Sequence, residues 1–214
     1  MVEESSYSID YQYFGSIDYI FNLINYTDLV FLSAVMHDKA QHLNRTWLNG
    51  PNNLVGLSIP LKGGRNVRQP VRDIQVAEDR NWKRIHWRTI HDCYRKSPWF
   101  DEYSDGLRLL YERDQKFLID WCFDSCQWSL QTLMKKSDIL TEKSVSSKTI
   151  QLAFEREPQL QVSEVYPTYQ QVFSDKHGFI ANLSILDLLL NEGPHSFFYL
   201  QKLTACKKTS LNHR

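Results

Sequence analysis

The densest concentration of charge in the chain is basic, and it lies between residues 62 and 96. This span holds ten Lys or Arg residues and four Asp or Glu residues, a surplus of six positive charges in a chain that has 25 basic and 25 acidic residues overall. Gly63 and Gly64 lie near its start, and glycine lets backbone amides approach an anion closely. The pattern is typical of a solvated helix face beside a basic loop, and it also suits an anion-binding site.

Arg45 is the strongest single candidate for holding an anion. It follows Asn44 within "HLNRTWL", where the neighbouring residues give little reason for a charge unless the guanidinium has a partner. A planar guanidinium beside an amide suits a carboxylate or a phosphate. The sequence identifies no catalytic residue. It does predict an anion pocket at the strand ends of an α/β sheet, formed by Asn44, Arg45, Lys62, Gly63, Gly64, Arg65, Arg68 and Arg84.

Asp187 lies in the aliphatic run "LSILDLLL", where a carboxylate is either a tuned catalytic group or part of a helix cap. Ser184 precedes it by three residues, which is the spacing of an N-cap residue and its N3 partner. This spacing favours a structural Asp187 that faces the first-turn amides at the positive end of a helix. Gly193 and Pro194 predict the end of that helix, with Gly193 at a positive φ, and the start of another.

Other catalytic and metal-binding patterns are absent or weak. The chain has no Gly-x-Ser-x-Gly elbow, no Walker loop, no Gly-x-Gly-x-x-Gly and no His-Glu-x-x-His. Cys122 and Cys126 would share one helix face, but they would hold a metal only with further ligands, and free cysteine is more often a small buried hydrophobe. His86 belongs to an apolar helical stripe, as a core histidine does, whereas His37 and His91 are freer. We predict no metal and no cofactor.

Hydrophobic periodicity places these residues on an α/β framework. Apolar residues at helical spacing and short β-branched runs bounded by polar residues indicate helices and strands, respectively. The strands of the N-terminal half are expected to form a central sheet flanked by helices, in a single domain over residues 1–214 with a helical C-terminal part. The polar stretch 135–164 is expected to be a surface excursion of weak or conditional order. The sequence predicts helices over 16–25, 81–96, 114–134 and 194–203, strands over 28–36, 53–61 and 71–77, and a turn over 62–70.

Composition argues against several classes of protein. Balanced charge and the lack of a recognised module argue against nucleic-acid binding. The acidic N-terminal segment lacks the features of a secretory signal, and no apolar run approaches the roughly 20 residues that span a bilayer. The four scattered cysteines fit reduced thiols. These features predict a cytoplasmic protein without membrane insertion, whose partner is an anionic small molecule or another protein.

Several segments together resemble one protein family. The segments "LNR", "LSIPLKGG", "HWRTIHDCYRKSPWFDEY", "YQQVF" and "GFIANLSILDLLLNEGP" follow one another in the chain, and their order is similar to that of the WbqC-like proteins, over residues 13–203. The resemblance implies an α/β domain and a transferase role linked to bacterial surface polysaccharides. The N-terminal His-Gln-Pro pattern of that family is not matched. Ile9, Asp10 and Tyr11 occupy its places, so the general base that the pattern would supply is missing.

Two hypotheses of function remain open. The first is a transferase that acts on an activated sugar or acyl donor, whose anionic group the guanidinium side chains bind. The second is a binding or scaffold protein derived from that family, and the missing His-Gln-Pro pattern favours such binding without turnover. A scaffold would present an exposed aromatic patch, for which the candidates are Tyr7, Tyr11, Tyr13 and Trp99.

Overall fold

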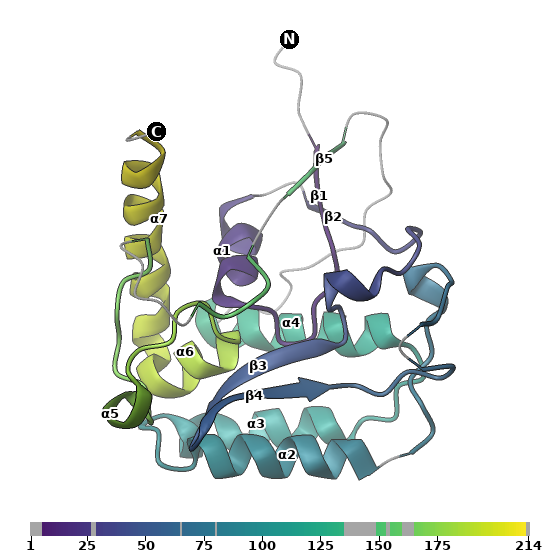
Figure 1. Cartoon of the computed structure of the whole chain (residues 1–214), viewed down its shortest axis with the longest axis horizontal. Coiled ribbons are helices and arrows are strands. Elements are labelled where there is room, and N and C mark those ends of the chain that lie inside the picture. Colours follow the sequence, from purple (N-terminus) through teal and green to yellow (C-terminus); the bar gives the residue numbers. More distant parts are fainter. Residues whose placement is uncertain are drawn as a thin grey trace.

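The parallel sheet of the fold is built from strands that are far apart in the sequence. Strands β1 (Ser6–Ile9), β2 (Leu29–Phe31) and β5 (Thr149–Gln151) are parallel and lie in the order β2-β1-β5 (Figure 1). β5 falls within the stretch expected to be a surface excursion, most of which lies outside the described residues. The computed structural model describes residues 6–26, 29–64, 66–79, 81–134, 149–152, 155–159 and 165–212.

A second, antiparallel sheet consists of one hairpin. Strands β3 (Arg45–Gly50) and β4 (Asn53–Ser58) pair so that Arg45 lies opposite Ser58. β4 confirms the start of the strand predicted over 53–61, although the strand ends at Ser58. β3 was not predicted, because polar residues at both of its ends leave too short an apolar alternation to indicate a strand.

Helices make up most of the rest of the described chain, so the fold is α/β, as predicted. Helices α2 and α3 lie below the hairpin in Figure 1, and α2 contacts β3. None of the described helices is both long enough and apolar enough to cross a membrane. The helices are α1 (Ile17–Asn25), α2 (Asn81–Tyr94), α3 (Phe100–Glu112), α4 (Leu118–Met134), α5 (Ser174–His177), α6 (Ile185–Glu192) and α7 (Ser196–Asn212), with 3-10 turns η1 (Lys39–Gln41), η2 (Val71–Asp73) and η3 (Gly193–His195).

The strand expected over 28–36 is limited to β2, and β4 lies in the separate hairpin and not in one central sheet. Two further parts of the framework differ from the sequence-based expectation. Residues 71–77 form η2 and two isolated bridges instead of a strand, because Val71 follows Pro70 and donates its backbone N–H to Val35, which bends the segment towards the chain after β2. The helix predicted over 81–96 ends at Tyr94, and the separate helix α3 follows it. α3 was not predicted, because Gly106 and several polar residues dilute its apolar stripe.

α6 is the innermost helix. All of its residues from Ile185 to Asn191 are buried, and it contacts α1, α3, α4, α7 and β3. Ser184 is its N-cap, as predicted, and the Oγ of Ser184 accepts the backbone N–H of Leu186 at 3.3 Å. Gly193 ends the helix with a φ of 53°, as predicted, and a Cβ at that position would lie 2.2 Å from the ring of Trp99.

The carboxylate of Asp187 does not contact the first-turn amides, so that part of the prediction is wrong. The carboxylate is fully buried and accepts hydrogen bonds from the hydroxyls of Tyr94 (2.9 Å) and Tyr169 (2.6 Å) and from Nε2 of Gln171 (2.9 Å). Burial raises the pKa of Asp187 to about 6, although these three donors favour the charged form. Hydrogen bonds from side chains of α2 and of the segment before α5 therefore satisfy the Asp187 carboxylate. The local sequence pattern had assigned this carboxylate to the N-terminal cap of α6.

Candidate anion-binding site

A cavity of about 710 Å³ lies between the chain that follows β2 and the open end of the hairpin. Loops at the carboxyl ends of parallel strands are where α/β folds usually bind ligands, and sites for small molecules measure roughly 300–1,000 Å³. We call it the Arg45 cavity. Among the described residues, those that line it include two cations and no Asp or Glu. The lining residues are His37, Lys39, Ala40, His42, Asn44, Arg45, Ser58, Ile59, Pro60, Leu61 and Gly64.

Arg45 is held at the edge of this cavity by its neighbours on the hairpin. It is the first residue of β3, and its Nε donates a hydrogen bond to Oγ of Ser58 at 3.1 Å. The guanidinium carbon lies 5.6 Å from the centre of the Trp47 ring. No carboxylate pairs with Arg45, and its two terminal nitrogens donate to no acceptor within the described part of the chain. These nitrogens therefore remain available to bind an anion bidentately.

Ser58 is itself positioned by a buried chain of hydrogen bonds. Its backbone carbonyl accepts a hydrogen bond from His86 on α2. The Nδ1 of His86 lies 3.0 Å from the hydroxyl of Tyr13, which lies 2.5 Å from the hydroxyl of Tyr111. Burial lowers the pKa of His86 to about 4, so the ring is neutral at pH 7.

His86 is thus a core histidine, as its place on the apolar stripe indicated, and it is 3% exposed. Through Ser58 it connects the aromatic core to the side chain that holds Arg45. Local residue spacing carries no signal for this connection, because Tyr13, His86 and Tyr111 lie on three separate segments.

The other polar residues of the Arg45 cavity have different roles. The amide of Asn44 donates to the carbonyl of Ile59 at 2.7 Å, so it closes the hairpin base instead of facing a ligand. His42 has a φ of 51°, and its Nε2 lies 3.3 Å from a carboxylate oxygen of Glu157. Burial lowers the pKa of His37, and its Nδ1 is buried with no hydrogen-bond partner among the described residues. His37 is therefore a neutral side chain at pH 7 with unused hydrogen-bonding capacity.

The structure brings together only part of the predicted anion set. Gly64 lines the Arg45 cavity with a φ of 77°, and, its chain neighbours apart, no described residue has an atom within 4 Å of where its Cβ would be. Gly63 precedes it with a φ of 87°. Arg68 lines an adjoining cavity, and Arg84 lies on α2, where it donates to Asn81. Arg65 lies outside the described residues.

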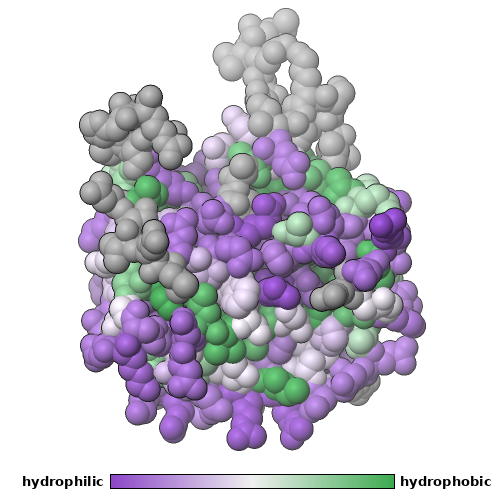
Figure 2. Space-filling model, viewed as in Figure 1, coloured by the Kyte–Doolittle hydropathy of each residue, from purple (hydrophilic) through white to green (hydrophobic). Residues whose placement is uncertain are grey.

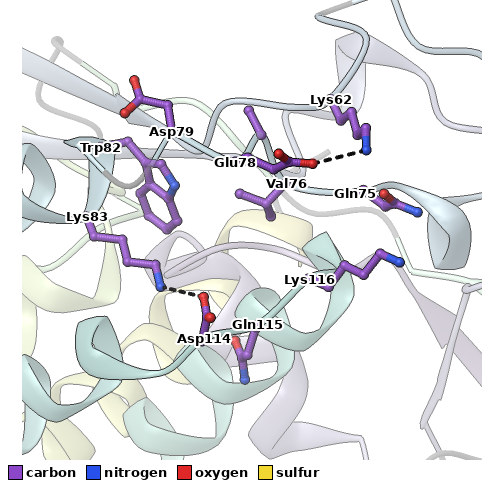
Figure 3. Close-up of a pocket in the computed structure, with 11 residues that line it drawn as sticks. Lys62, Gln75, Val76, Glu78, Asp79, Trp82, Lys83, Asp114, Gln115 and Lys116 are labelled. Carbon is purple, nitrogen blue, oxygen red and sulfur yellow. Dashed lines mark hydrogen bonds and ion pairs between the residues drawn. The ribbon is translucent and has the colours of Figure 1, made fainter.

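Lys62 lies in a different cavity of about 550 Å³, near the starts of α2 and α4 (Figure 3). Here lysines and carboxylates face one another: Lys62 lies 3.3 Å from Glu78, and Lys83 lies 3.6 Å from Asp114. Trp82 lines the same cavity. Because its cations are neutralised by carboxylates, this cavity is a poorer anion site than the Arg45 cavity.

The buried cysteines belong to no cluster of metal ligands among the described residues. Cys122 and Cys126 are each 1% exposed, and burial raises the pKa of both thiols. Sγ of Cys122 donates to the carbonyl of Leu43 at 3.4 Å. Within the described ranges, no three His, Cys, Asp or Glu side chains are grouped as metal ligands would be.

The fold and cavity define an α/β protein with a cationic, ligand-sized cavity beside its parallel sheet. The chain belongs to the WbqC-like protein family, which it matches over residues 12–161. The segment "GFIANLSILDLLLNEGP", which forms the core helix α6 and its flanks, lies beyond the matched residues. No curated protein and no solved structure matches the chain.

Proposed function

We propose that this WbqC-like protein is a cytoplasmic transferase of bacterial surface-polysaccharide assembly that binds an anionic activated sugar or acyl donor in the Arg45 cavity. The observation that carries the proposal is a cavity of ligand size in which Lys39 and Arg45 have no carboxylate partner among the described residues. Membership of the WbqC-like family supports the link to this class of chemistry.

Arg45 binds the phosphate or carboxylate of the donor through its two terminal nitrogens. Its Nε is already held by Ser58, so the planar group needs little reordering when an anion arrives. The apolar side chains of Pro60 and Leu61 line the same cavity and contact an uncharged part of the donor. In a transfer reaction a guanidinium at this place also stabilises negative charge that develops on the leaving group.

Binding without turnover is a second candidate, and the environment of Asp10 favours it. Asp10 takes one of the places of the His-Gln-Pro pattern, is 2% exposed and lies 2.5 Å from Nη2 of Arg156. Gln151 donates to the same carboxylate at 3.3 Å. A carboxylate that is buried and paired in this way is poorly placed to remove a proton from an acceptor.

An aromatic docking patch is not supported by the structure. Tyr11 and Tyr13 are 1% and 0% exposed, so these two side chains are part of the core and not of a surface. Hydrophilic side chains cover most of the face shown in Figure 2, and hydrophobic ones form smaller areas. The large hydrophobic side chains that are exposed lie on separate segments, and among the described residues they are Met36, Ile85, Leu109 and Phe198.

Titration calorimetry with a nucleoside diphosphate sugar and with a coenzyme A thioester tests the proposal. Arg45→Ala should weaken binding of the true donor class about tenfold or more, since a hydrogen bond to a charged group is worth about 1.5–3 kcal/mol and about 1.4 kcal/mol is a factor of ten. Arg84→Ala is the matched control, because this exposed arginine on α2 donates to Asn81, outside the cavity.

The two variants separate the outcomes. A similar response of Arg45→Ala and Arg84→Ala to both ligands would show that the Arg45 cavity is not the binding site. If binding depends on Arg45, incubation of the bound donor with candidate acceptors, followed by mass spectrometry, distinguishes a transferase from a protein that binds without turnover.

A further inference from the structure

A second cationic cavity adjoins the first. It has a volume of about 460 Å³, and Asp38, Asn66, Val67 and Arg68 line it together with His37 and Lys39. His37 and Lys39 also line the Arg45 cavity, so these two residues form the ridge between the cavities. We call the second one the Arg68 cavity.

The ridge is held by backbone hydrogen bonds to the chain before and within η2. The backbone N–H of His37 donates to the carbonyl of Gln69 at 3.0 Å, and Met36 forms an antiparallel bridge with Pro70. Val71 donates to the carbonyl of Val35 at 2.9 Å. These backbone hydrogen bonds restrain the ridge, and they thereby restrain the separation of the two cavities.

The charges around the ridge are not balanced. Lys39 and Arg68 are exposed, and neither pairs with a carboxylate within the described part of the chain. Among the described residues that line the two cavities, Asp38 is the one carboxylate, and its Oδ1 accepts the backbone N–H of Ala40 at 2.9 Å. The described lining residues thus comprise three cations, Lys39, Arg45 and Arg68, and one carboxylate, a surplus of two positive charges among them.

We infer that the two cavities form one site for a small molecule that carries two anionic phosphoryl groups, one bound by Arg45 and the other by Arg68, with Lys39 between them. This inference rests on the proposed anion binding at Arg45 and specifies the chemical class of the ligand. A single carboxylate would neutralise only part of the surplus charge, whereas two phosphoryl groups supply enough negative charge and enough acceptor oxygens for all three cations.

The linings of the cavities orient such a ligand. Ala40, Pro60 and Leu61 contribute apolar surface to the Arg45 cavity, whereas the described residues that line the Arg68 cavity include one aliphatic side chain, that of Val67. The uncharged part of the ligand therefore lies beside Arg45, and the terminal phosphoryl group lies beside Arg68. Gly64 lines the Arg45 cavity, and residues 66–68 line the Arg68 cavity.

The test uses inorganic phosphate, pyrophosphate and tripolyphosphate as probes of increasing length, measured by calorimetry at constant ionic strength because exposed charges are screened by salt. The parent should bind at least one of the longer probes about tenfold more tightly than phosphate. Arg68→Ala should reduce the affinity for that probe to about the level of phosphate and leave phosphate itself within about twofold. Arg45→Ala should weaken the binding of all three probes, and Arg84→Ala should leave the binding of each unchanged.

The outcomes keep this inference separate from the proposed function. If Arg45→Ala weakens the binding of every probe and Arg68→Ala weakens the binding of none, the inference of two subsites is refuted, while anion binding at Arg45 stands. Loss of phosphate binding in Arg68→Ala would also contradict separate subsites. Equal affinities of the parent for all three probes, or an effect of Arg84→Ala as large as that of Arg68→Ala, would refute the inference as a non-specific charge effect.

Discussion

Replacing Asp187 by asparagine should change how the stability of the protein depends on pH. The pKa of Asp187 rises from an ordinary 3.8 to about 6 because the carboxyl is fully buried. The folded protein therefore holds this proton more tightly than the unfolded chain does. Its contribution to stability is complete below pH 3.8 and is lost as the pH rises through about 6. At about 1.36 kcal/mol for each unit of pKa difference, the loss is about 3 kcal/mol.

His86 has the opposite effect in the same pH range. Its pKa falls from 6.5 to about 4, so protonation favours the unfolded chain and stability increases as the pH rises from 4 to 6.5. The two effects partly cancel in the parent protein. Asp187→Asn removes the effect of Asp187 and keeps that of His86. The free energy of unfolding of the variant should therefore rise by about 3 kcal/mol relative to that of the parent between pH 4 and pH 7.

Urea unfolding of both proteins at several pH values between 4 and 7.5 measures this difference directly. In Asp105→Asn, which changes an exposed carboxylate on α3, the free energy of unfolding should depend on pH as it does in the parent. A constant difference in unfolding free energy between the parent and Asp187→Asn across this range would refute the argument from burial. Anion binding should stay within a few-fold of the parent in Asp187→Asn, because Asp187 does not line the Arg45 cavity.

Two further predictions concern glycine geometry and the hydrogen-bond chain behind Arg45. Gly193→Ala should destabilise the protein by more than about 2 kcal/mol in urea unfolding, because its Cβ would clash with the Trp99 ring. Gly64→Ala, with a positive φ but open space, should cost only about 1 kcal/mol, and equal losses would contradict this reasoning. Tyr13→Phe should cost about 1–3 kcal/mol, since it removes the hydroxyl that contacts Nδ1 of His86, and unchanged stability would show that this contact is dispensable.

Local sequence patterns predicted the elements that bury their own apolar surface. The spacing of apolar residues in α1, α2 and α4 was sufficient, because each of these helices buries one continuous stripe. The strands β1 and β5 have four and three residues, which is too short for a periodic signal. Their pairing depends on contacts between distant segments, and these leave no trace in local spacing.

The candidate site was predictable only in part, for a similar reason. Arg45 stood out because the neighbouring sequence offered it no carboxylate, and the structure shows that none pairs with it in the described part of the chain. Lys62 was expected in the site because it lies in the basic span, but it pairs with Glu78, which lies sixteen positions away. Asn44 was expected to help bind an anion, yet its amide holds the backbone of Ile59. Charge density located the region, and the hydrogen-bond partners of each side chain decided its role.

The pairing of β1 with β5 affects the order in which the chain can fold during synthesis. Tyr7 pairs with Ile150, 143 positions later, and Ile17 donates its backbone N–H to the carbonyl of Leu183. One edge of β1 must therefore stay without a partner strand until residue 150 has left the ribosome, and an open strand edge readily pairs with other chains. Contacts of such long range also close slowly, because a large loop must be ordered first. The nascent chain thus presents an aggregation-prone edge for much of its synthesis.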